Sequence, residues 1–279
     1  MKNYLIIGAA LLYSTAAMAD SITILNSGSK TGGFSMQSTA YSQDLAKDFD
    51  ITLVNPGDRC VALGNLLPKI TGPVLMPWAS DYEAVGRDGA CVTFDINQGT
   101  VVRYDTSPVY VCTRGGDVTK DSGKVGHTVP ANGPLARVIT ELNKEFKTSH
   151  SPVVYDGSGD ARLAIINGEV DYALLSKKHT GIVMEADSSI NCDTSLAVDG
   201  LAASTGNKKL AFGFDTVWLV LNADANTTNK IKMSMMEKHL NCNSAIGTWS
   251  KCNTTLNSRW DLTVEEASKN WETMVATQR

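Results

Sequence analysis

The sequence predicts an α/β protein made of two Rossmann-like lobes that are joined by a hinge. Two observations lead to this fold class. β-rich runs alternate with helical stretches over residues 22–76, and the same alternation starts again over residues 124–175. A β-rich connector, residues 91–113, lies between the two series. Because such alternation is typical of a mainly parallel sheet covered by helices, its repetition indicates two similar lobes.

The individual elements follow from turn residues and from the period of the apolar positions. In the first series we expect strands at 22–26, 51–54 and 74–76 and helices at 35–49 and 60–70. In the connector we expect separate strands at 91–95, 100–104 and 109–113. In the second series we expect strands at 124–129, 153–155 and 170–175 and helices at 135–146 and 161–167. Gly168 is placed to end the last of these helices as a C-cap.

The last third of the chain has a less regular pattern. Residues 187–207 are polar and loop-like, whereas 210–221 form an apolar β-rich run that we expect to return the chain to the first lobe. Two amphipathic helices are expected at 230–240 and 263–276. On this basis lobe 1 comprises 20–110 and 212–279, lobe 2 comprises 111–211, and the hinge lies near 106–113 and 211–219.

Residues 1–19 have the pattern of a cleavable signal peptide. Lys2 supplies a positive charge, residues 4–12 are apolar, and Ala17-Met18-Ala19 has the small-x-small form of a cleavage site. The apolar run is shorter than the roughly 20 residues that cross a bilayer. We therefore expect cleavage after Ala19 and a periplasmic protein.

The composition argues against several classes of function. The net charge is −4 and no Lys/Arg run interrupts it, which argues against a nucleic-acid partner. The chain has no P-loop and no H-E-x-x-H, and Gly157-Ser158-Gly159 is not a nucleophile elbow. Four scattered histidines and the lack of C-x-x-C argue against a metal site. We predict no catalytic residue, no metal and no cofactor.

The cysteines predict disulfides, because an even number in an exported chain is typical of a bridged protein. Cys242 and Cys252 flank a turn-rich stretch and are the first expected pair, with Cys60 and Cys91 as the second. Cys112 lies in an expected buried strand, where it can serve as an apolar filler. The sixth cysteine is Cys192.

Three glycine-containing loops precede expected helices, at 27–35, 130–133 and 156–160. In open α/β sheets, ligands bind beyond the carboxyl ends of the strands. Glycine lets a ligand approach the backbone, and free N–H groups at a helix start suit a carboxylate or phosphate. Lys30 and Arg162 stand at two of these loops, and whether either contacts the ligand stays open.

Four stretches give the chain a resemblance to a known family: Gly32-Gly33 before a helix, Asn55-Pro56-Gly57-Asp58 after a strand, Tyr155-Asp156-Gly157-Ser158-Gly159 followed by Gly168-Glu169-Val170-Asp171, and residues 212–223 with Trp218. The chain resembles the periplasmic solute-binding proteins of tripartite tricarboxylate transporters, within the type II periplasmic binding protein class. It departs from their pattern at Met36, where the family has an acid, and at Thr227-Thr228-Asn229, where the family has Thr-Pro.

The resemblance implies that two loops hold a carboxylate, largely through backbone N–H groups. By position these residues are Ser27, Gly28, Thr31, Gly32, Gly33, Phe34 and Ser35, with Ala131, Asn132 and Gly133 opposite and Ser176 also facing the cleft. The glycine loops add Lys30 and Ser158 as candidates.

The predicted function is a periplasmic receptor that captures a small anionic solute between its lobes and delivers it to membrane transporter subunits. We expect a monomer that binds a carboxylate. An amino acid, a phosphorus oxyanion or a pyrimidine-like compound remains an alternative ligand. Two other classes also stay open: a secreted hydrolase that uses the same cleft, and an interaction protein with a vestigial cleft.

Overall fold

A computed structural model describes residues 20–79, 94–128, 131, 133–192, 197–241 and 257–278. The strands are β1 (Asp20–Leu25), β2 (Phe49–Val54), β3 (Val74–Ala79), β4 (Thr100–Thr113), β5 (Lys124–Thr128), β6 (Ser151–Tyr155), β7 (Tyr172–Ser176), β8 (Gly213–Leu221) and β9 (Asn257–Arg259). The α-helices are α1 (Gly33–Leu45), α3 (Pro134–Phe146), α4 (Ser158–Ile166), α5 (Lys177–Ala186), α6 (Val198–Thr205), α7 (Ala225–Asn241) and α9 (Val264–Gln278), and a π-helix spans Val61–Leu66.

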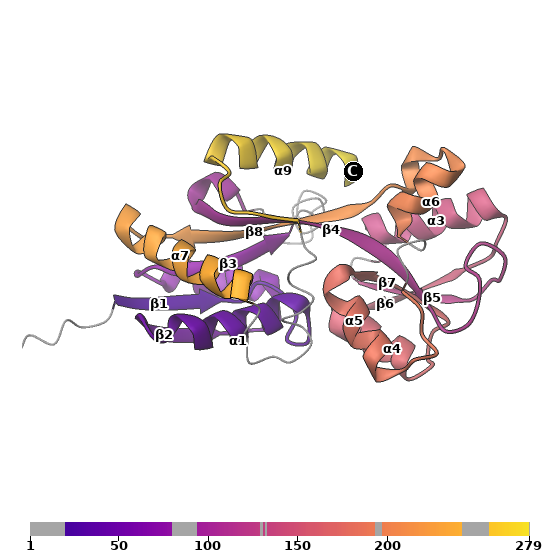
Figure 1. Ribbon diagram of the computed structural model, residues 1–279, viewed down its shortest axis with the longest axis horizontal. Helices are drawn as coiled ribbons and strands as arrows, with labels where there is room; N and C mark the ends of the chain where they lie inside the picture. The colour runs from indigo at the N-terminus through magenta and orange to yellow at the C-terminus, as the bar shows by residue number, and fades with distance from the viewer. Residues whose placement is uncertain are drawn as a thin grey trace, which may run out of the picture.

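The molecule divides into two bodies that β4 and β8 connect (Figure 1). The first lobe contains β1 to β3 with α1, α7 and α9, and the second lobe contains β5 to β7 with α3 to α6. The strands follow the order β2-β1-β3-β8-β4-β7-β5-β6, and β9 pairs with β4. β1 runs parallel to β2 and β3, and β5 runs parallel to β6 and β7. The predicted α/β class is therefore confirmed.

One long strand, β4, replaces the two separate strands that the sequence predicts at 100–104 and 109–113. Its first part pairs with β8 as far as Pro108, and from Val109 onward it pairs with β7. Proline cannot donate to a ladder and is tolerated where pairing ends. The prediction was wrong because Pro108 marks a change of partner within one strand and not the end of a strand. Most of the further strand expected at 91–95 lies outside the described residues.

Two separate sets of buried apolar residues form the cores of the two lobes. The first set comes from residues 22–104 and 217–271, and the second comes from residues 109–212. β4 contributes to both, with Val101 and Val102 in the first lobe and Val109 and Val111 in the second. Trp218 of β8 is fully buried against Tyr41 of α1, with ring centroids 4.8 Å apart.

Two helices lie where the sequence predicts none. α6 lies within the stretch 187–207, for which the sequence predicts a polar loop. α5 follows β7 directly, and its buried side chains are Lys178, His179, Thr180 and Val183. Three of these four are polar, so α5 lacks the apolar stripe that normally identifies a helix packed against a core.

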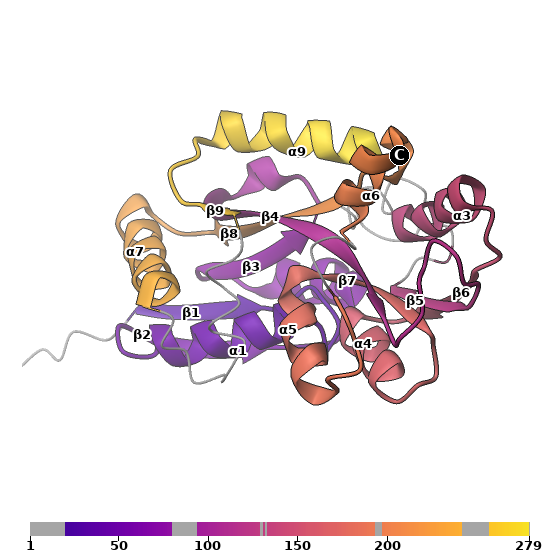
Figure 2. The same ribbon diagram turned by 45° about the vertical axis from the view of Figure 1, so that its right-hand side comes forward.

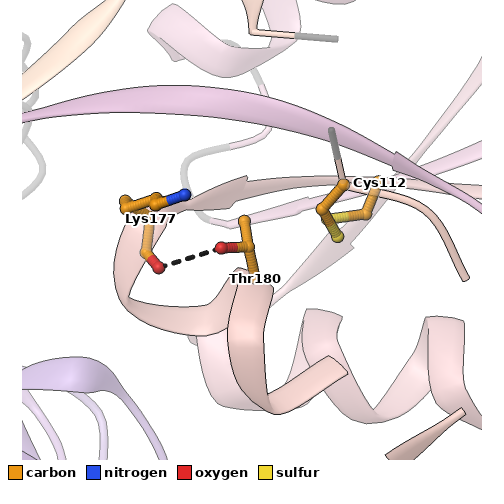
Figure 3. Close-up of a disulfide and its surroundings, with 4 residues drawn as sticks. Cys112, Lys177 and Thr180 are labelled. Atoms are coloured by element: carbon orange, nitrogen blue, oxygen red, sulfur yellow. Dashed lines mark hydrogen bonds between the residues drawn. A yellow bond between two sulfur atoms is a disulfide. The ribbon is translucent and has the colours of Figure 1, made fainter. Parts of the chain in front are cut away.

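A disulfide joins Cys112 of β4 to Cys192, across a sequence separation of 80. It lies beside the first turn of α5, where the Thr180 hydroxyl donates to the Lys177 carbonyl (Figure 3). Cys112 is therefore bridged as well as buried, and does not serve only as an apolar filler. Cys60 is also disulfide-bonded. The expected partner Cys91 and the expected pair Cys242 and Cys252 lie outside the described residues, as does the predicted signal peptide.

Within the described ranges, no helix is both long and apolar enough to cross a membrane.

Candidate ligand-binding site

A cavity of about 360 Å³ lies between the two lobes. Its walls come from the segments that follow the carboxyl ends of β1, β2, β5, β6 and β7. This is the edge at which open α/β sheets bind their ligands. Ser107 of β4 and Thr216 of β8 also line it, from the two strands that connect the lobes.

Part of the predicted ligand-binding set lines this cavity: Ser27, Gly28, Gly32, Gly33, Phe34, Ser158 and Ser176. Of the other predicted residues, those that the structure describes do not line it. Lys30 is exposed, and its side chain lies against Gly57. Ala131 is exposed, and Gly133 is buried as the N-cap of α3. Asn132 lies outside the described residues.

Thr31 and Ser35 form hydrogen bonds with other side chains beside the cavity. The Thr31 hydroxyl bonds Asp160 of α4, and the Ser35 hydroxyl accepts a 2.7 Å hydrogen bond from Asn55 Nδ2. Ser35 lies inside α1, whose N-cap is Gly32, so the helix starts earlier than the sequence suggests. The same Asn55 side chain accepts a 2.7 Å hydrogen bond from Asn26 Nδ2, and Asn26 Oδ1 accepts from the Gly28 N–H at 3.0 Å. These amides fix the loop that leads from β1 to α1.

The two lobes touch along one side of the cavity through glycines. A Cβ atom on Gly157 would lie 2.0 Å from Ser29 Oγ, and one on Gly159 would lie 2.1 Å from the Thr31 carbonyl oxygen. No side chain fits at such distances. Gly157 and Gly159 belong to the second lobe, and Ser29 and Thr31 belong to the first. The glycines of the Gly157-Ser158-Gly159 motif therefore permit the lobes to close on each other.

α5 supplies a buried cation that the sequence did not predict. Lys178 is only 5% exposed and lines the cavity. Its Nζ donates a 3.2 Å hydrogen bond to Gln37 Oε1 and lies 5.1 Å from the centre of the Phe34 ring, both on α1 of the opposite lobe. Figure 2 shows α5 and α1 facing each other across the lobes. Burial lowers the pKa of Lys178 to about 8.

His179, the next residue, is fully buried and also lines the cavity. Among the described residues, neither of its ring nitrogens has a hydrogen-bond partner. Burial, together with the neighbouring Arg162 and Lys178, lowers its pKa to about 3, so the ring is neutral at physiological pH. A Cβ atom on Gly33 would lie 3.4 Å from His179 Nε2 and 3.4 Å from Lys178 Cδ. Gly33 thus lets α1 begin close against α5.

Other charged residues near the connecting strands are already paired. Arg103 and Asp105 of β4 form a fully buried ion pair of 2.8 Å, and Arg103 also donates to the Tyr41 hydroxyl. Tyr104 donates to Asp215 of β8, whose pKa is raised to about 6 by burial. Of the described residues, no group of three or more His, Cys, Asp and Glu side chains could hold a metal ion.

No protein-family model and no curated protein sequence matches the chain. Several solved structures match its fold. One described as a periplasmic transporter is 13% identical, covers 94% of this chain and 96% of its own, and has a TM-score of 0.70. MatC from Rhodopseudomonas palustris with bound malate is 12% identical, with coverages of 92% and 96% and a TM-score of 0.61. Another R. palustris protein, determined with adipate, is 13% identical, with coverages of 92% and 94% and a TM-score of 0.64. The chain is thus similar in fold to a periplasmic transporter and to the periplasmic binding protein BugD, and the predicted two-lobed α/β fold is confirmed.

Proposed function

We propose that this protein is a periplasmic receptor that captures a small carboxylate between its lobes and delivers it to membrane transporter subunits. The observation that carries the proposal is the cavity between the lobes, whose wall includes the buried Lys178 ammonium. An anionic solute would supply the negative charge that a buried cation requires. The malate and adipate held by two proteins of similar fold support a carboxylate as the ligand.

The proposed mechanism is capture by closure. The solute enters while the lobes are apart, and backbone N–H groups around Gly33 and the α5 side chains contact its anionic group. Closure then brings Gly157 and Gly159 against the loop that precedes α1. We place the hinge near 106–113 and 211–219, with lobe 1 at 20–110 and 212–279 and lobe 2 at 111–211. The change of β4 partners at Pro108 lies inside the first of these segments.

Several further features belong to the same proposal. The receptor is a member of the solute-binding proteins of tripartite tricarboxylate transporters, it is exported with removal of residues 1–19, and it works as a monomer. It is a binding protein and not an enzyme. Replacing Ser158 by Ala tests the last point, because a hydrolase that used this hydroxyl would lose turnover, whereas a receptor would show no turnover before or after the change.

A thermal-shift screen tests the function directly. Organic acids, amino acids, phosphorus oxyanions and sugars are each added to the purified protein at matched ionic strength. A ligand present at 100 times its Kd should stabilise the fold by about 2.7 kcal/mol. The expected result is stabilisation by a subset of carboxylates, with a smaller radius of gyration on saturation. Stabilisation by a sugar alone would overturn the carboxylate assignment, and an unchanged radius would argue against closure.

A further inference from the structure

We infer that the side chains of Lys178 and His179, on the first turn of α5, bind one carboxylate group of the solute at the inner wall of the cavity. This inference rests on the proposed receptor function and makes it more specific. It adds a charged side-chain contact to a site that the sequence predicts to work mainly through backbone N–H groups.

Lys178 Nζ has one hydrogen-bond acceptor among the described residues. An ammonium group has three N–H donors, and Gln37 Oε1 accepts from one of them. Within the described part of the chain, no carboxylate lies within ion-pair distance of Lys178 Nζ. A buried ammonium group without a counter-ion destabilises the folded protein. Such groups are retained where a bound ligand supplies the opposite charge.

The surrounding charged residues do not supply a counter-ion for Lys178. Asp105 is the acid whose charge acts on it most strongly, but Asp105 already forms a buried ion pair of 2.8 Å with Arg103. The effects of these two partners on the pKa of Lys178 are opposite in sign. On the α5 side the neighbouring His179 is neutral, and Arg162 of α4 is itself a cation. Arg103 therefore offsets part of the effect of Asp105, and no described carboxylate forms a direct ion pair with Lys178.

His179 supplies the second, independent observation. Both ring nitrogens are buried without partners among the described residues, although the residue lines the cavity. A neutral imidazole carries one N–H donor and one acceptor, so it can donate to a carboxylate oxygen without adding charge. Lys178 and His179 together offer one positive charge and one neutral donor, which matches a single carboxylate.

The apolar part of the wall indicates the chemistry of the rest of the ligand. Phe34, Leu135 and Leu174 line the same cavity, and the Phe34 ring lies 5.1 Å from Lys178 Nζ. An aliphatic stem can pack on these side chains while its carboxylate reaches α5. The inferred ligand class is a small aliphatic carboxylic acid.

The inference is tested by measuring the affinity for malate and adipate in three variants. These are Lys178→Met, Lys178→Arg and the matched control Lys177→Met. Loss of one hydrogen-bonded charge contact should weaken binding by about 10- to 100-fold in Lys178→Met. Lys178→Arg, which keeps the charge, should recover part of the affinity. Replacing Lys177 should change the affinity by no more than about twofold. Its Nζ lies over the Tyr110 ring, and the residue does not line the cavity.

A second measurement on the unaltered protein covers the case in which Lys178→Met fails to fold. Because the pKa of Lys178 is about 8 in the empty cavity, a bound carboxylate should make the protein take up close to one proton per ligand at pH 9. Calorimetry in two buffers of different ionisation enthalpy counts this proton. His179 contributes nothing to it, since its pKa of about 3 keeps it neutral throughout this range.

The outcomes separate the two proposals. Acid binding that weakens in Lys178→Met, or proton uptake in the wild-type protein, supports the inference. Wild-type binding with equal affinity in Lys178→Met and no proton uptake overturns the Lys178 assignment and leaves the receptor function standing. A wild-type protein that binds neither acid and is stabilised by no other carboxylate of the thermal-shift screen overturns both.

Discussion

The hydroxyl group of Thr31 donates a hydrogen bond of 2.9 Å to Asp160 Oδ1, across 129 residues of sequence. Thr31 precedes α1 in the first lobe, and Asp160 lies in the first turn of α4 in the second. Gly157 is the N-cap of α4, and the Asp160 carboxylate accepts a bond from the opposite lobe. The Gly157-Ser158-Gly159 motif beside it is therefore a contact between lobes as well as a wall of the cavity.

Replacing Thr31 by Val should weaken the closed arrangement. The change removes a hydrogen bond to a charged acceptor at an exposed position, which we expect to contribute about 0.5–1.5 kcal/mol. Affinity for the bound acid, measured by calorimetry, should fall by a few fold, and thermal stability without ligand should change little. Thr140→Val is the control, because the Thr140 hydroxyl bonds Ala136 within α3. Equal effects of both variants would show that the Thr31 contact does not assist closure.

Replacing Gly159 by Ala should have a larger effect, because its Cβ would meet the Thr31 carbonyl oxygen at 2.1 Å and backbone cannot easily retreat. We expect at least about tenfold weaker binding and a larger radius of gyration with ligand present. The fold itself should remain intact, since alanine favours a helix over glycine by up to about 1 kcal/mol. Gly72→Ala, where nothing lies within 4 Å of the added Cβ, is the matched control. Normal binding by Gly159→Ala would mean that the lobes do not close as described.

The pKa of Lys178 predicts how stability depends on pH in the absence of ligand. Its value in the folded protein is about 8, below its ordinary value of 10.5. Between these two values the unfolded chain holds a proton that the folded chain has released, so the free energy of unfolding rises with pH. The rise should reach about 3 kcal/mol. Denaturant unfolding of wild-type protein and Lys178→Met at pH 7 and pH 10.5 measures the difference. A pH-independent difference between the two proteins would contradict this prediction.

Removing the disulfide should destabilise the second lobe. The bridge between Cys112 and Cys192 closes a loop with a sequence separation of 80. On the chain-entropy model, losing it lowers the free energy of unfolding by about 4.5 kcal/mol. The double variant Cys112→Ala and Cys192→Ala should show this loss in urea unfolding without reducing agent. Wild-type stability that equals that of the double variant would show that the purified protein lacks the bridge.

Much of the fold could be predicted because its signals are local. The alternation of β-rich runs and amphipathic helices, together with glycines such as Gly57 and Gly168 at turns with positive φ, fixes the order of most elements. The loop at 27–34 and the motif at 157–159 could be assigned to the cavity for the same reason. In each of these two segments, glycine before a helix indicates a position where the backbone lies close to another part of the protein or to a ligand.

Tertiary structure alone decided the partners of distant residues. Nothing near Cys112 in the sequence indicates Cys192, and the change of strand partners at Pro108 depends on β7 and β8, which are distant in the sequence. α5 was missed because its buried face carries Lys178 and His179, whereas a helix is recognised in sequence by apolar residues on its buried side. Polar groups occupy that face because it borders a cavity, and only the packing of one lobe against the other creates the cavity. The sequence by itself determines the two lobes and their glycine loops, and lobe packing determines which charge lies between them.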